Sequence, residues 1–433
     1  MQHRMIKDGI LYYNGYNLLD LAKKYGTPLK ITFLDVIKEH VLLLKNTFDK
    51  SIQETNYNGK FFYLNANKAN YSKEEIYESY LYSDGLETSS YYDLLLTAKM
   101  MENDKKKLIV SNGIKEDDYL DKIIELHQDG YNIIDIIDSK EEYLKLKEKN
   151  IDLNVGLRVH LSSKYHGEGE SEILLNDRFG INHNDLDFII SDLKNTKMHL
   201  NTIHYHQRGF DYVKGPFLKN FMATIDIYEK AIKAGYPIDN LDIGGGTPLP
   251  IEENFDYDNW TKFVLNTLKD ECHKRGIKEP NIIIENGKFS QKDSTVNIYK
   301  VISIKDTENE YPWYTVNGSL LIALPEMIAL GEPILVMPIN GLDKLTKKGA
   351  LAGMTCDCDD VLLDNHQYFN LPDEKEIYIG CIGTGSYQNS MNGKGGIHHC
   401  LLPEEKDIVI KDGKEYIRHD LQSIEDIYKL IKM

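Results

Sequence analysis

Several reactive or charged side chains in the middle of the chain stand at the ends of short apolar runs. Lys68 follows FFYLNA (61–66), where an ε-amine is partly desolvated, and such lysines form Schiff bases with carbonyl compounds. Glu285 lies in NIIIENG (281–287), at the end of another apolar run. Taken alone, a structural ion pair with Glu87 or Glu285 explains Lys68 better. The chemistry becomes specific only when these residues are considered as a group.

Two further features supply what a planar, phosphorylated ligand needs. Gly244, Gly245 and Gly246 in DIGGGTP present backbone N–H groups free of side chains, which is one way to hold a phosphate, although a tight turn explains them as well. His206 offers a ring for stacking, and an ordinary core histidine is its alternative. Together, a carbonyl-reactive lysine, a phosphate cradle, a planar ring and a buried carboxylate are what pyridoxal 5'-phosphate requires. Glu285 would face the pyridine nitrogen and keep it protonated.

The elements that would position these residues alternate regularly. Runs rich in Ile, Val and aromatic residues are separated by longer amphipathic segments. Strand then helix, repeated eight times, predicts an α/β fold with a (β/α)8 barrel, and a doubly wound open sheet is the alternative. In a barrel, the polar strand ends would face one pocket. The eight runs are FFYLNA (61–66), GLETSS (85–90), KLIVSNG (107–113), YNIIDIIDS (131–139), LNVGLRVH (153–160), LNTIHYHQ (200–207), NLDIGGG (240–246) and NIIIENG (281–287).

The pattern changes near residue 295, where strand-like runs such as VNIYKVISI, EPILVMPI and EIYIGCIG follow one another without intervening helices. We therefore expect residues 51–295 to form the barrel and residues 296–433 to form a mainly antiparallel β domain. GILYYNG and LKITFL predict that residues 1–50 add edge strands to this β domain. The barrel would then be an insertion within it.

Composition narrows the class of protein and its partners. A net charge of −17 argues against nucleic acid as a partner and suits a cationic small substrate, although solubility alone explains an acidic surface. The longest apolar stretch, 320–339, is interrupted by prolines and acids, so we expect no membrane contact and a cytoplasmic protein. The five cysteines show no paired spacing and are expected to be reduced thiols.

The same motifs resemble, in order and over nearly the full length, the barrel-type (fold type III) pyridoxal-phosphate decarboxylases of basic amino acids. That family includes ornithine, diaminopimelate and biosynthetic arginine decarboxylases. YLNANKAN resembles its Schiff-base lysine segment, and GLETSSYYDL resembles the motif of its second strand. The later matches are LRV, DRFGI, IHYHQRG, DIGGGTP, ENGK, TCDCDD and GTGSY. Each motif alone is weak evidence, whereas the ordered set is specific.

The resemblance implies a role for each of these residues. Lys68 would bond to the cofactor, His206 would stack on its ring, and Glu285 would meet the pyridine nitrogen. The other cofactor-binding residues that it implies are Glu87, Arg158, Gly244, Gly245, Gly246, Lys288 and Tyr387. The chain also departs from the family pattern, because Lys288 stands where an arginine usually binds the phosphate, and Arg208 and Gly209 replace a usual serine.

The TCDCDD loop indicates the reaction. By resemblance, Cys356 is the proton donor after decarboxylation, and Asp357 holds the distal cation of the substrate with Asp359 or Asp360. Cys-Asp is typical of the ornithine and arginine enzymes, whereas diaminopimelate decarboxylases usually carry Cys-Glu-Ser. The resemblance therefore implies that arginine is converted to agmatine and CO2. Ornithine, lysine and diaminopimelate stay as alternatives, since biosynthetic arginine decarboxylases are often longer, and a non-catalytic regulatory homologue is a remote one.

The same loop falls in the β domain, whereas Lys68 falls in the barrel. The resemblance implies a homodimer with shared active sites, in which Cys356 and Asp357 act in the other subunit. Metal binding is the rival explanation for Cys356 and Cys358. Two thiols this close, with no second Cys or His pair at recognisable spacing, make a poor zinc site, so we expect no metal. Cys358 is then only a small residue in place of serine.

Overall fold

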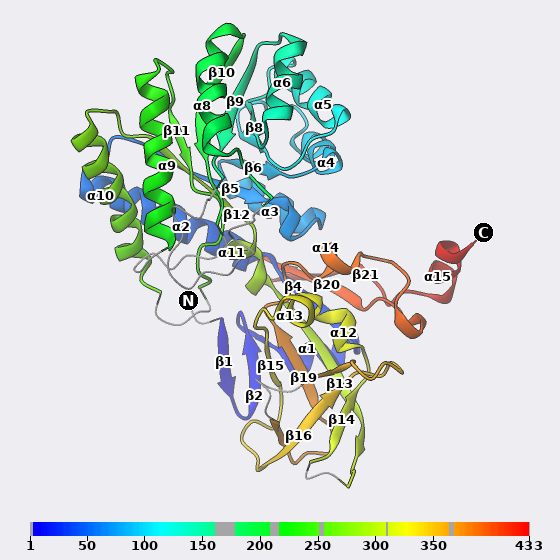
Figure 1. Ribbon diagram of the computed structural model, residues 1–433. Helices are drawn as coiled ribbons and strands as arrows, with labels where there is room; N and C mark the ends of the chain where they lie inside the picture. The colour runs from blue at the N-terminus through cyan, green and yellow to red at the C-terminus, as the bar shows by residue number, and fades with distance from the viewer. Residues whose placement is uncertain are drawn as a thin grey trace. The chain divides into compact units, whose positions relative to one another are not determined.

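A computed structural model describes residues 3–160, 178–207, 216–250, 255–308, 311–362 and 368–432. The chain divides into two compact units, each drawn in Figure 1. We call them the barrel unit and the β unit. The barrel unit comprises His40–Lys68 and Ile76–Phe289, and the β unit comprises Met1–Glu39, Ala69–Glu75 and Ser290–Met433.

Eight parallel strands form the centre of the barrel unit. They are β5 Phe61–Ala66, β6 Gly85–Thr88, β7 Leu108–Ser111, β8 Ile133–Ile137, β9 Leu153–Arg158, β10 Met198–His204, β11 Asn240–Asp242 and β12 Asn281–Asn286. They close into a barrel in the order β10-β11-β12-β5-β6-β7-β8-β9. Seven of the eight expected runs contain one of these strands, and the run 200–207 overlaps β10, which begins two residues earlier at Met198. The (β/α)8 prediction is therefore confirmed and the doubly wound alternative is wrong.

Helices alternate with these strands and lie outside them (Figure 1). The described helices are α2 Leu34–Thr55, α3 Lys73–Tyr82, α4 Tyr91–Met101, α5 Asp117–Gln128, α6 Lys140–Lys149, α8 His183–Asp192, α9 Pro216–Lys233 and α10 Tyr257–Arg275. Polar side chains set where several of them begin, since Ser90 accepts from Asp93 N and Ser139 accepts from Glu142 N. The five residues of β8 are all buried, as expected for a strand between the barrel interior and the helices.

The β unit contains a ten-stranded mixed sheet. Its strands are β4 Leu29–Phe33, β13 Thr295–Lys305, β14 Trp313–Val316, β15 Leu335–Pro338, β16 Thr346–Ala352, β17 Val361–Leu362, β18 Phe369–Pro372, β19 Tyr378–Ile382, β20 Lys406–Lys411 and β21 Lys414–His419. Among the described strands of this sheet, the pairings are antiparallel except for β14 with β16 and β20 with β4. A separate three-stranded sheet consists of β1 Arg4–Lys7, β2 Ile10–Tyr13 and β3 Tyr16–Asn17.

Some details of the β unit differ from expectation. The N-terminal strand β4 is not an edge strand, because it lies between β13 and β20 and all five of its residues are buried. GILYYNG forms β2 in the separate small sheet. Strands β16 and β18 and the short helices α12 Leu320–Ala323 and α13 Pro325–Leu330 were not predicted. The strand β16 escapes a pattern search because it begins with three exposed residues, TKK.

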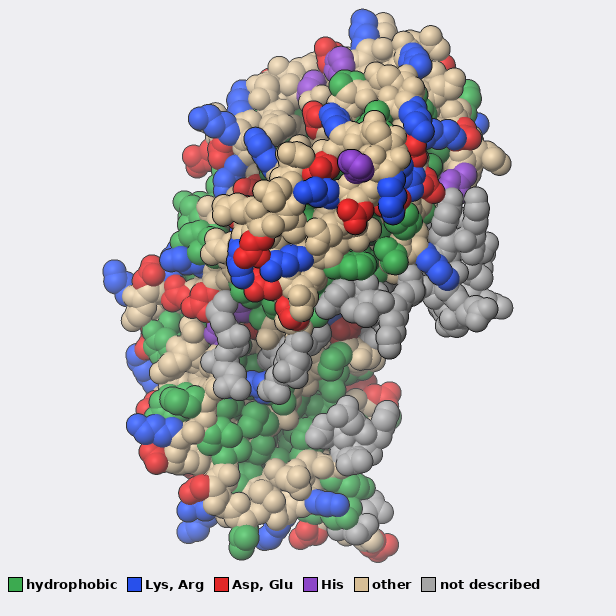
Figure 2. Space-filling model, turned by 90° about the vertical axis from the view of Figure 1, so that its left-hand side faces the viewer, with side chains coloured by type: hydrophobic (Ala, Val, Ile, Leu, Met, Phe, Trp, Pro, Cys, Tyr) green, Lys and Arg blue, Asp and Glu red, His purple; other side chains and the backbone are tan. Residues whose placement is uncertain are grey.

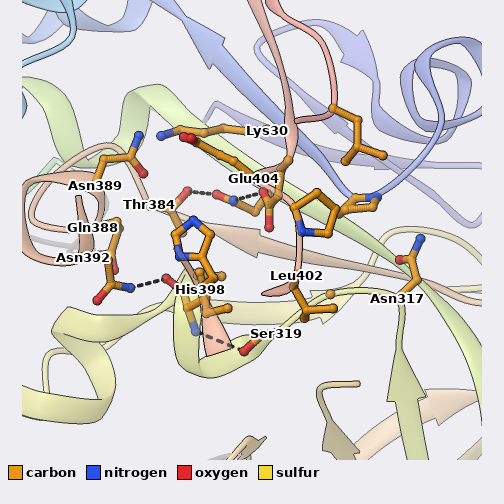
Figure 3. A pocket seen from close by; sticks show the side chains of 18 of the residues that line it. Lys30, Asn317, Ser319, Thr384, Gln388, Asn389, Asn392, His398, Leu402 and Glu404 are labelled. Atoms are coloured by element: carbon orange, nitrogen blue, oxygen red, sulfur yellow. Dashed lines mark hydrogen bonds between the residues drawn. The ribbon is translucent and has the colours of Figure 1, made fainter. Parts of the chain in front are cut away.

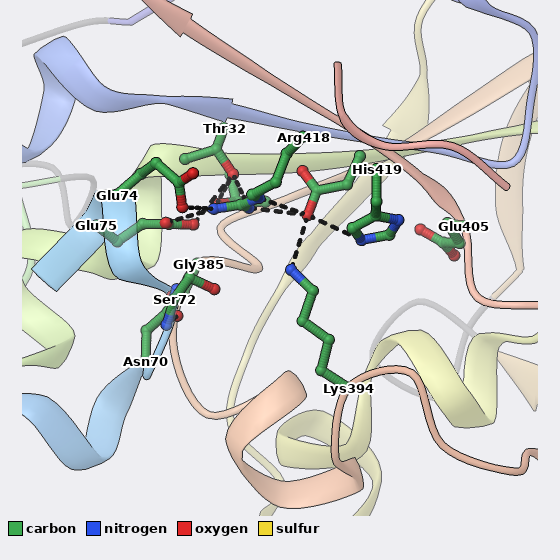
Figure 4. A network of polar contacts seen from close by, with 12 residues as sticks. Thr32, Asn70, Ser72, Glu74, Glu75, Gly385, Lys394, Glu405, Arg418 and His419 are labelled. Carbon is green, nitrogen blue, oxygen red and sulfur yellow. Dashed lines mark hydrogen bonds and ion pairs between the residues drawn. The ribbon is translucent and has the colours of Figure 1, made fainter. Parts of the chain in front are cut away.

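A buried ion-pair network joins the strands of the β unit (Figure 4). Arg418 in β21 lies 2.5 Å from Glu75, 2.8 Å from Asp407 and 3.2 Å from Glu74. Burial alone would raise the pKa of Asp407, but the hydrogen bond from His419 and the neighbouring cations outweigh it and hold that pKa well below its ordinary value. Asp407 is therefore a carboxylate that depends on its cations.

The surface carries charges of both signs. On the face in Figure 2, Lys and Arg side chains stand beside Asp and Glu, with no continuous basic area. Ion pairs such as Lys145 with Asp117 and Lys149 with Asp121 connect α6 with α5. Across the described ranges, no helix is long and apolar enough to cross a membrane.

Candidate active site

A cavity of about 460 Å³ opens at the carboxyl ends of the barrel strands. Four of the residues expected at the site, Lys68, Arg158, His206 and Glu285, lie in its wall. The full lining is Lys68, Ser89, Asn112, Gly113, Ile114, Arg158, Arg178, Phe179, His204, His206 and Glu285. Side chains from strands distant in sequence therefore face one space.

Lys68 stands in the turn after β5 and reaches an acid at the end of β6. Its Nζ lies 2.9 Å from Glu87 Oε2, and the Glu87 side chain is fully buried while that of Lys68 is 39% exposed. The ion pair that is the structural explanation of Lys68 is thus present. Because Lys68 also lines the cavity, the pair orients the amine without removing it from the site.

Asn112, which sequence reasoning did not single out, joins two of the acids. Its Nδ2 donates to Glu87 Oε1 at 3.1 Å and to Glu285 Oε1 at 2.7 Å. Asn112 follows β7 directly, much as Lys68 follows β5, so its place at a strand end was the available signal. One amide therefore connects Glu87 with Glu285, and of these two acids Glu285 lines the cavity.

Glu285 belongs to a buried cluster with Asp242 and His204. His204 Nδ1 lies 3.3 Å from Asp242 Oδ1. Burial, and then the charge of Asp242, raises the pKa of Glu285 to about 8, and burial raises the pKa of Asp242 to about 7. Burial lowers the pKa of His204 to about 4. The two acids therefore retain protons near neutral pH, and a cation beside Glu285, such as a protonated pyridine ring, would favour its carboxylate.

His206 is held as a neutral ring. Its Nδ1 accepts a hydrogen bond from Gly245 N at 3.2 Å, which leaves the ring proton on Nε2. Burial, followed by the charges of Lys68 and Arg158, lowers the pKa of His206 well below 6.5. A neutral ring in one tautomer at the cavity wall is suited to stacking against a planar ligand.

The three glycines after β11 have different tasks. Gly244 has φ +68°, and a Cβ on Gly245 would lie 2.2 Å from a backbone oxygen of β12, so both positions require glycine. Their N–H groups already donate, to Asp242 Oδ1 at 2.9 Å and to His206 Nδ1. Within the described parts of the chain, the exposed Gly246 N–H has no hydrogen-bond acceptor. Of the three expected amides, Gly246 is thus the one open to a phosphate.

Arg158, at the end of β9, brings positive charge to the cavity. Its Nη1 lies 3.2 Å from Asp138 Oδ1, and its Cζ lies 4.5 Å from the ring centroid of Phe179. Arg178 Cζ lies 4.4 Å from the same ring. Cation–π contacts to Phe179 therefore help to position both guanidiniums. Sequence reasoning had quoted Arg178 and Phe179 only as part of the DRFGI motif.

Other expected residues lie outside this cavity wall. Lys288 begins the short helix α11 Lys288–Gln291 and is half-buried. Tyr387 belongs to the β unit, where its backbone has φ 54° and its N–H donates to Ala69 O at 2.8 Å. Arg208 and Gly209, at the replaced serine position, lie outside the described residues.

The loop after β16 carries the expected proton donor and substrate acids, and it belongs to the β unit. Cys356 and Asp359 are exposed, and Asp357 is half-buried. Asp360 is buried, and its carboxylate accepts from a backbone N–H of α12 at 3.0 Å and from Thr355 Oγ1 at 2.7 Å. These bonds make Asp360 a structural cap, so Asp357 and Asp359 are the acids open to a substrate.

The structure brings a further cysteine and a histidine next to this loop, from a position that sequence spacing does not indicate. Cys400 Sγ lies 3.4 Å from Cys356 Sγ, and His399 stands next to Cys400. The hydrogen bond with Cys400 raises the pKa of the Cys356 thiol. The pair escaped notice because 44 residues separate Cys356 from Cys400. The available signal in the sequence was the run of two histidines and a cysteine in GIHHCLLPE.

A second cavity, of about 220 Å³, lies within the β unit (Figure 3). The buried Lys30 reaches into it beside Asn389, with Thr384, His398 and Glu404 nearby. Burial lowers the pKa of Lys30. The polar lining of this second cavity comes from segments near residues 30, 318, 390 and 404, which only folding brings together.

Curated proteins similar to the chain include arginine decarboxylases. The biosynthetic arginine decarboxylase of Prochlorococcus marinus (strain MIT 9215) is 26% identical over 313 residues, which cover 68% of this chain and 48% of the relative. That of Synechococcus sp. (strain RCC307) is 24% identical over 315 residues, covering 68% and 49%. The chain therefore spans about half the length of the curated relatives it matches.

Two solved structures share the fold. The biosynthetic arginine decarboxylase from Campylobacter jejuni superposes with a TM-score of 0.84 at 20% identity, covering 99% of this chain and 88% of that one. A diaminopimelate decarboxylase from M. jannaschii gives the same TM-score and identity, covering 100% and 98%. At this identity the likeness shows the fold alone.

The match of this chain to a family model shows which family it belongs to. The pyridoxal binding domain of the pyridoxal-dependent decarboxylases matches residues 50–291, which is more than half of the chain and includes all eight barrel strands. The barrel cavity fits that cofactor, because its wall combines an accessible amine, a protonated buried acid and a neutral ring. The chain belongs to the pyridoxal-dependent decarboxylases, whose cofactor is pyridoxal 5'-phosphate.

Proposed function

We propose that the chain decarboxylates a basic L-amino acid, and that its substrate is L-arginine, which yields agmatine and CO2. One observation carries the proposal: the exposed amine of Lys68 and the buried acid of Glu285 line the same cavity. A pyridoxal cofactor needs an amine at its aldehyde carbon and an acid at its ring nitrogen, and these two residues supply them.

When bound, pyridoxal 5'-phosphate supplies a ring that takes up the electron pair left as the substrate carboxylate departs as CO2. Lys68 presents its amine to the aldehyde carbon of the cofactor. Glu285 carries a titratable proton for the ring nitrogen, and His206 covers the ring. The Gly246 N–H and the cations around Phe179 bind the phosphate.

Two residues of the loop after β16 act on the substrate. Cys356 delivers a proton to Cα after CO2 has left, and Asp357 pairs with the guanidinium through two parallel hydrogen bonds. The loop comes from the other subunit of a two-fold dimer, so that each active site combines two chains.

Diaminopimelate is the second candidate, because the M. jannaschii diaminopimelate decarboxylase matches the fold as well as the C. jejuni arginine decarboxylase does. Its distal end carries a carboxylate as well as an ammonium. The neighbouring Asp357 and Asp359 would repel that carboxylate, which favours a substrate whose distal end is only cationic.

The first test concerns the cofactor and Lys68. Protein purified with pyridoxal phosphate should absorb as a cofactor adduct, and reduction with borohydride should fix the label on a peptide that contains Lys68. Lys68→Ala should carry no label, whereas Lys60→Ala, which changes an exposed lysine of the barrel unit outside the cavity wall, should keep it. A protein that takes up no cofactor would refute the proposed function.

The second test is a substrate panel with mass-spectrometric detection of the amine products. Arginine should give a higher kcat/KM than ornithine, lysine or meso-diaminopimelate. Asp357→Asn should lower kcat/KM for arginine by about 10- to 100-fold, since hydrogen bonds to charged groups contribute about 1.5–3 kcal/mol. Cofactor absorption should stay unchanged in this variant. Release of lysine from diaminopimelate, with arginine inert, would assign the second candidate.

A further inference from the structure

The pair His399 and Cys400 places metal-binding atoms around Cys356. Cys400 Sγ lies 3.4 Å from Cys356 Sγ and 3.2 Å from His399 Nδ1. One ligating atom from each of the three residues lies within 4.8 Å of the other two. All three side chains are exposed, so an ion from solvent can reach them.

These separations are close to those of a tetrahedral zinc site. Zn–S bonds of about 2.3 Å and Zn–N bonds of about 2.0 Å at tetrahedral angles place two sulfurs roughly 3.8 Å apart, and a sulfur and a nitrogen roughly 3.6 Å apart. The observed 3.4 Å and 3.2 Å differ from these values by a few tenths of an ångström. Small side-chain rotations of exposed residues are sufficient to seat an ion.

The groups around His399 and Cys400 resemble those around the ligands of known metal sites. Asp357 Oδ2 lies 3.9 Å from His399 Nε2, on the ring nitrogen that a metal at Nδ1 would leave free. Cys356 N donates to Cys400 Sγ at 3.3 Å, so the loop backbone holds this sulfur next to Cys356. Cys400 and Leu401 both have positive φ, 57° and 53°, so the backbone adopts an unfavourable conformation where the ligands are presented.

We infer that Cys356, His399 and Cys400 form a binding site for one soft divalent metal ion such as Zn²⁺, with water as the fourth ligand. The two thiols lose their protons to solvent on binding, and no electrons are transferred. Thiolate and imidazole ligands select zinc-like ions over Mg²⁺ or Ca²⁺. The neighbouring group Asp357, Cys358 and Asp359 has a single thiol and is the weaker site for such an ion.

Occupation of this site would inhibit the decarboxylase, a consequence that rests on the proposed function. A metal-bound Cys356 has no thiol proton to deliver to Cα. Binding of the metal and turnover would then exclude each other, so the loop would make the enzyme sensitive to zinc.

The test uses tag-free, full-length protein, stripped with EDTA and kept anaerobic with a phosphine reductant, so that no disulfide forms. Co²⁺ titration should produce a thiolate-to-cobalt absorption band that saturates at one equivalent and disappears when Zn²⁺ is added. Cys400→Ser and His399→Ala should each weaken binding by more than roughly tenfold, since even residues outside the first ligand shell contribute that much. Cys358→Ser, which changes an exposed thiol of the same loop, is the matched control and should bind normally.

The titration should be repeated on Lys68→Ala, which has no cofactor absorption. A cobalt band in this variant would support the metal site whether or not the proposed function is correct. A missing thiolate band, or a band lost in Cys358→Ser and retained in Cys400→Ser, would overturn the site. In the activity assay, one equivalent of Zn²⁺ should inhibit wild type and Cys358→Ser reversibly and leave Cys400→Ser active. Zinc that binds the wild type without inhibiting it would uphold the site and refute Cys356 as the proton donor.

Discussion

At the scale of residues, the barrel cavity gathers more acids than its cations neutralise. Glu87, Asp242 and Glu285 lie around one amine, that of Lys68, and Asn112 bonds two of the acids. A buried carboxylate without a cation is costly, so Asp242 and Glu285 retain protons instead. This arrangement favours binding of a cationic ring. The positive charge of such a ring would stabilise the Glu285 carboxylate, so that the acid no longer needs its proton.

These protons predict how stability depends on pH. In the cofactor-free protein the pKa of Asp242 is about 7 and that of Glu285 about 8, well above the values of unfolded acids. The folded state therefore binds more protons, and its stability falls as pH rises through these values. Between pH 6.5 and 8.5 we expect these two acids alone to remove about 2–3 kcal/mol of stability, or roughly 5 °C in Tm.

The control is Asp242→Asn, which removes one proton site and a charge that raises the pKa of Glu285. Its Tm should fall less over the same range. Burial also raises the pKa of Glu142 to about 8 and that of Asp93 to about 7, and these two acids contribute equally to both proteins. His204 works in the opposite direction only below pH 6.5, because its pKa is lowered. Parallel curves for the two proteins, measured by scanning calorimetry, would contradict the assignment.

At the scale of elements, Arg418 joins β21 to β20 and to the segment Ala69–Glu75 (Figure 4). Arg418→Met keeps the volume but leaves the buried Glu75 and Asp407 without their shared cation. We expect the free energy of unfolding of the β unit to fall by about 3–5 kcal/mol, as when one partner of a buried ion pair is removed. Urea unfolding monitored by circular dichroism would measure the loss.

Arg275→Met is the matched control. Arg275 on α10 also pairs with three acids, but its partner Asp226 is half exposed, and the cluster lies at the surface. Its loss should cost about 1 kcal/mol or less. Equal effects of the two substitutions would mean that burial of the Arg418 network adds no stability. Adding Asp407→Asn to Arg418→Met should recover part of the loss.

At the scale of the whole molecule, the proposed dimer makes a prediction about mixed subunits. Lys68→Ala lacks the cofactor amine and Cys356→Ala lacks the proton donor, so each homodimer should be nearly inactive. If the loop serves the partner's barrel, a hybrid dimer has both lesions in one site and an intact second site. Random pairing of equal amounts should restore roughly a quarter of wild-type activity.

Subunit exchange must be demonstrated separately, for example by native mass spectrometry of the mixed sample. Exchange without any recovery of activity would show that each loop serves its own chain. The control mixes Lys68→Ala with Glu285→Gln. Both changes lie in the barrel unit, so no hybrid site regains the missing residue.

The barrel and most of its cavity could be predicted from the sequence because their signals are local. Each apolar run is a strand whose neighbours are set by the chain order, and parallel strands end at one rim. Lys68, Arg158, His206 and Glu285 therefore had to meet. Asn112 shared this position and was missed only because an asparagine after a strand also suits an ordinary turn.

The tertiary structure decided the features that depend on partners from distant segments. The buried bonds of Asp360 make it a cap, the N–H groups of Gly244 and Gly245 are already engaged, and β4 is an interior strand. His399 and Cys400 come to Cys356 across 44 residues of sequence. Residue type and spacing determine which atoms are available to bond. Burial and hydrogen-bond partners are set by contacts between distant segments, so only the folded chain decides which of those atoms stay free for a ligand.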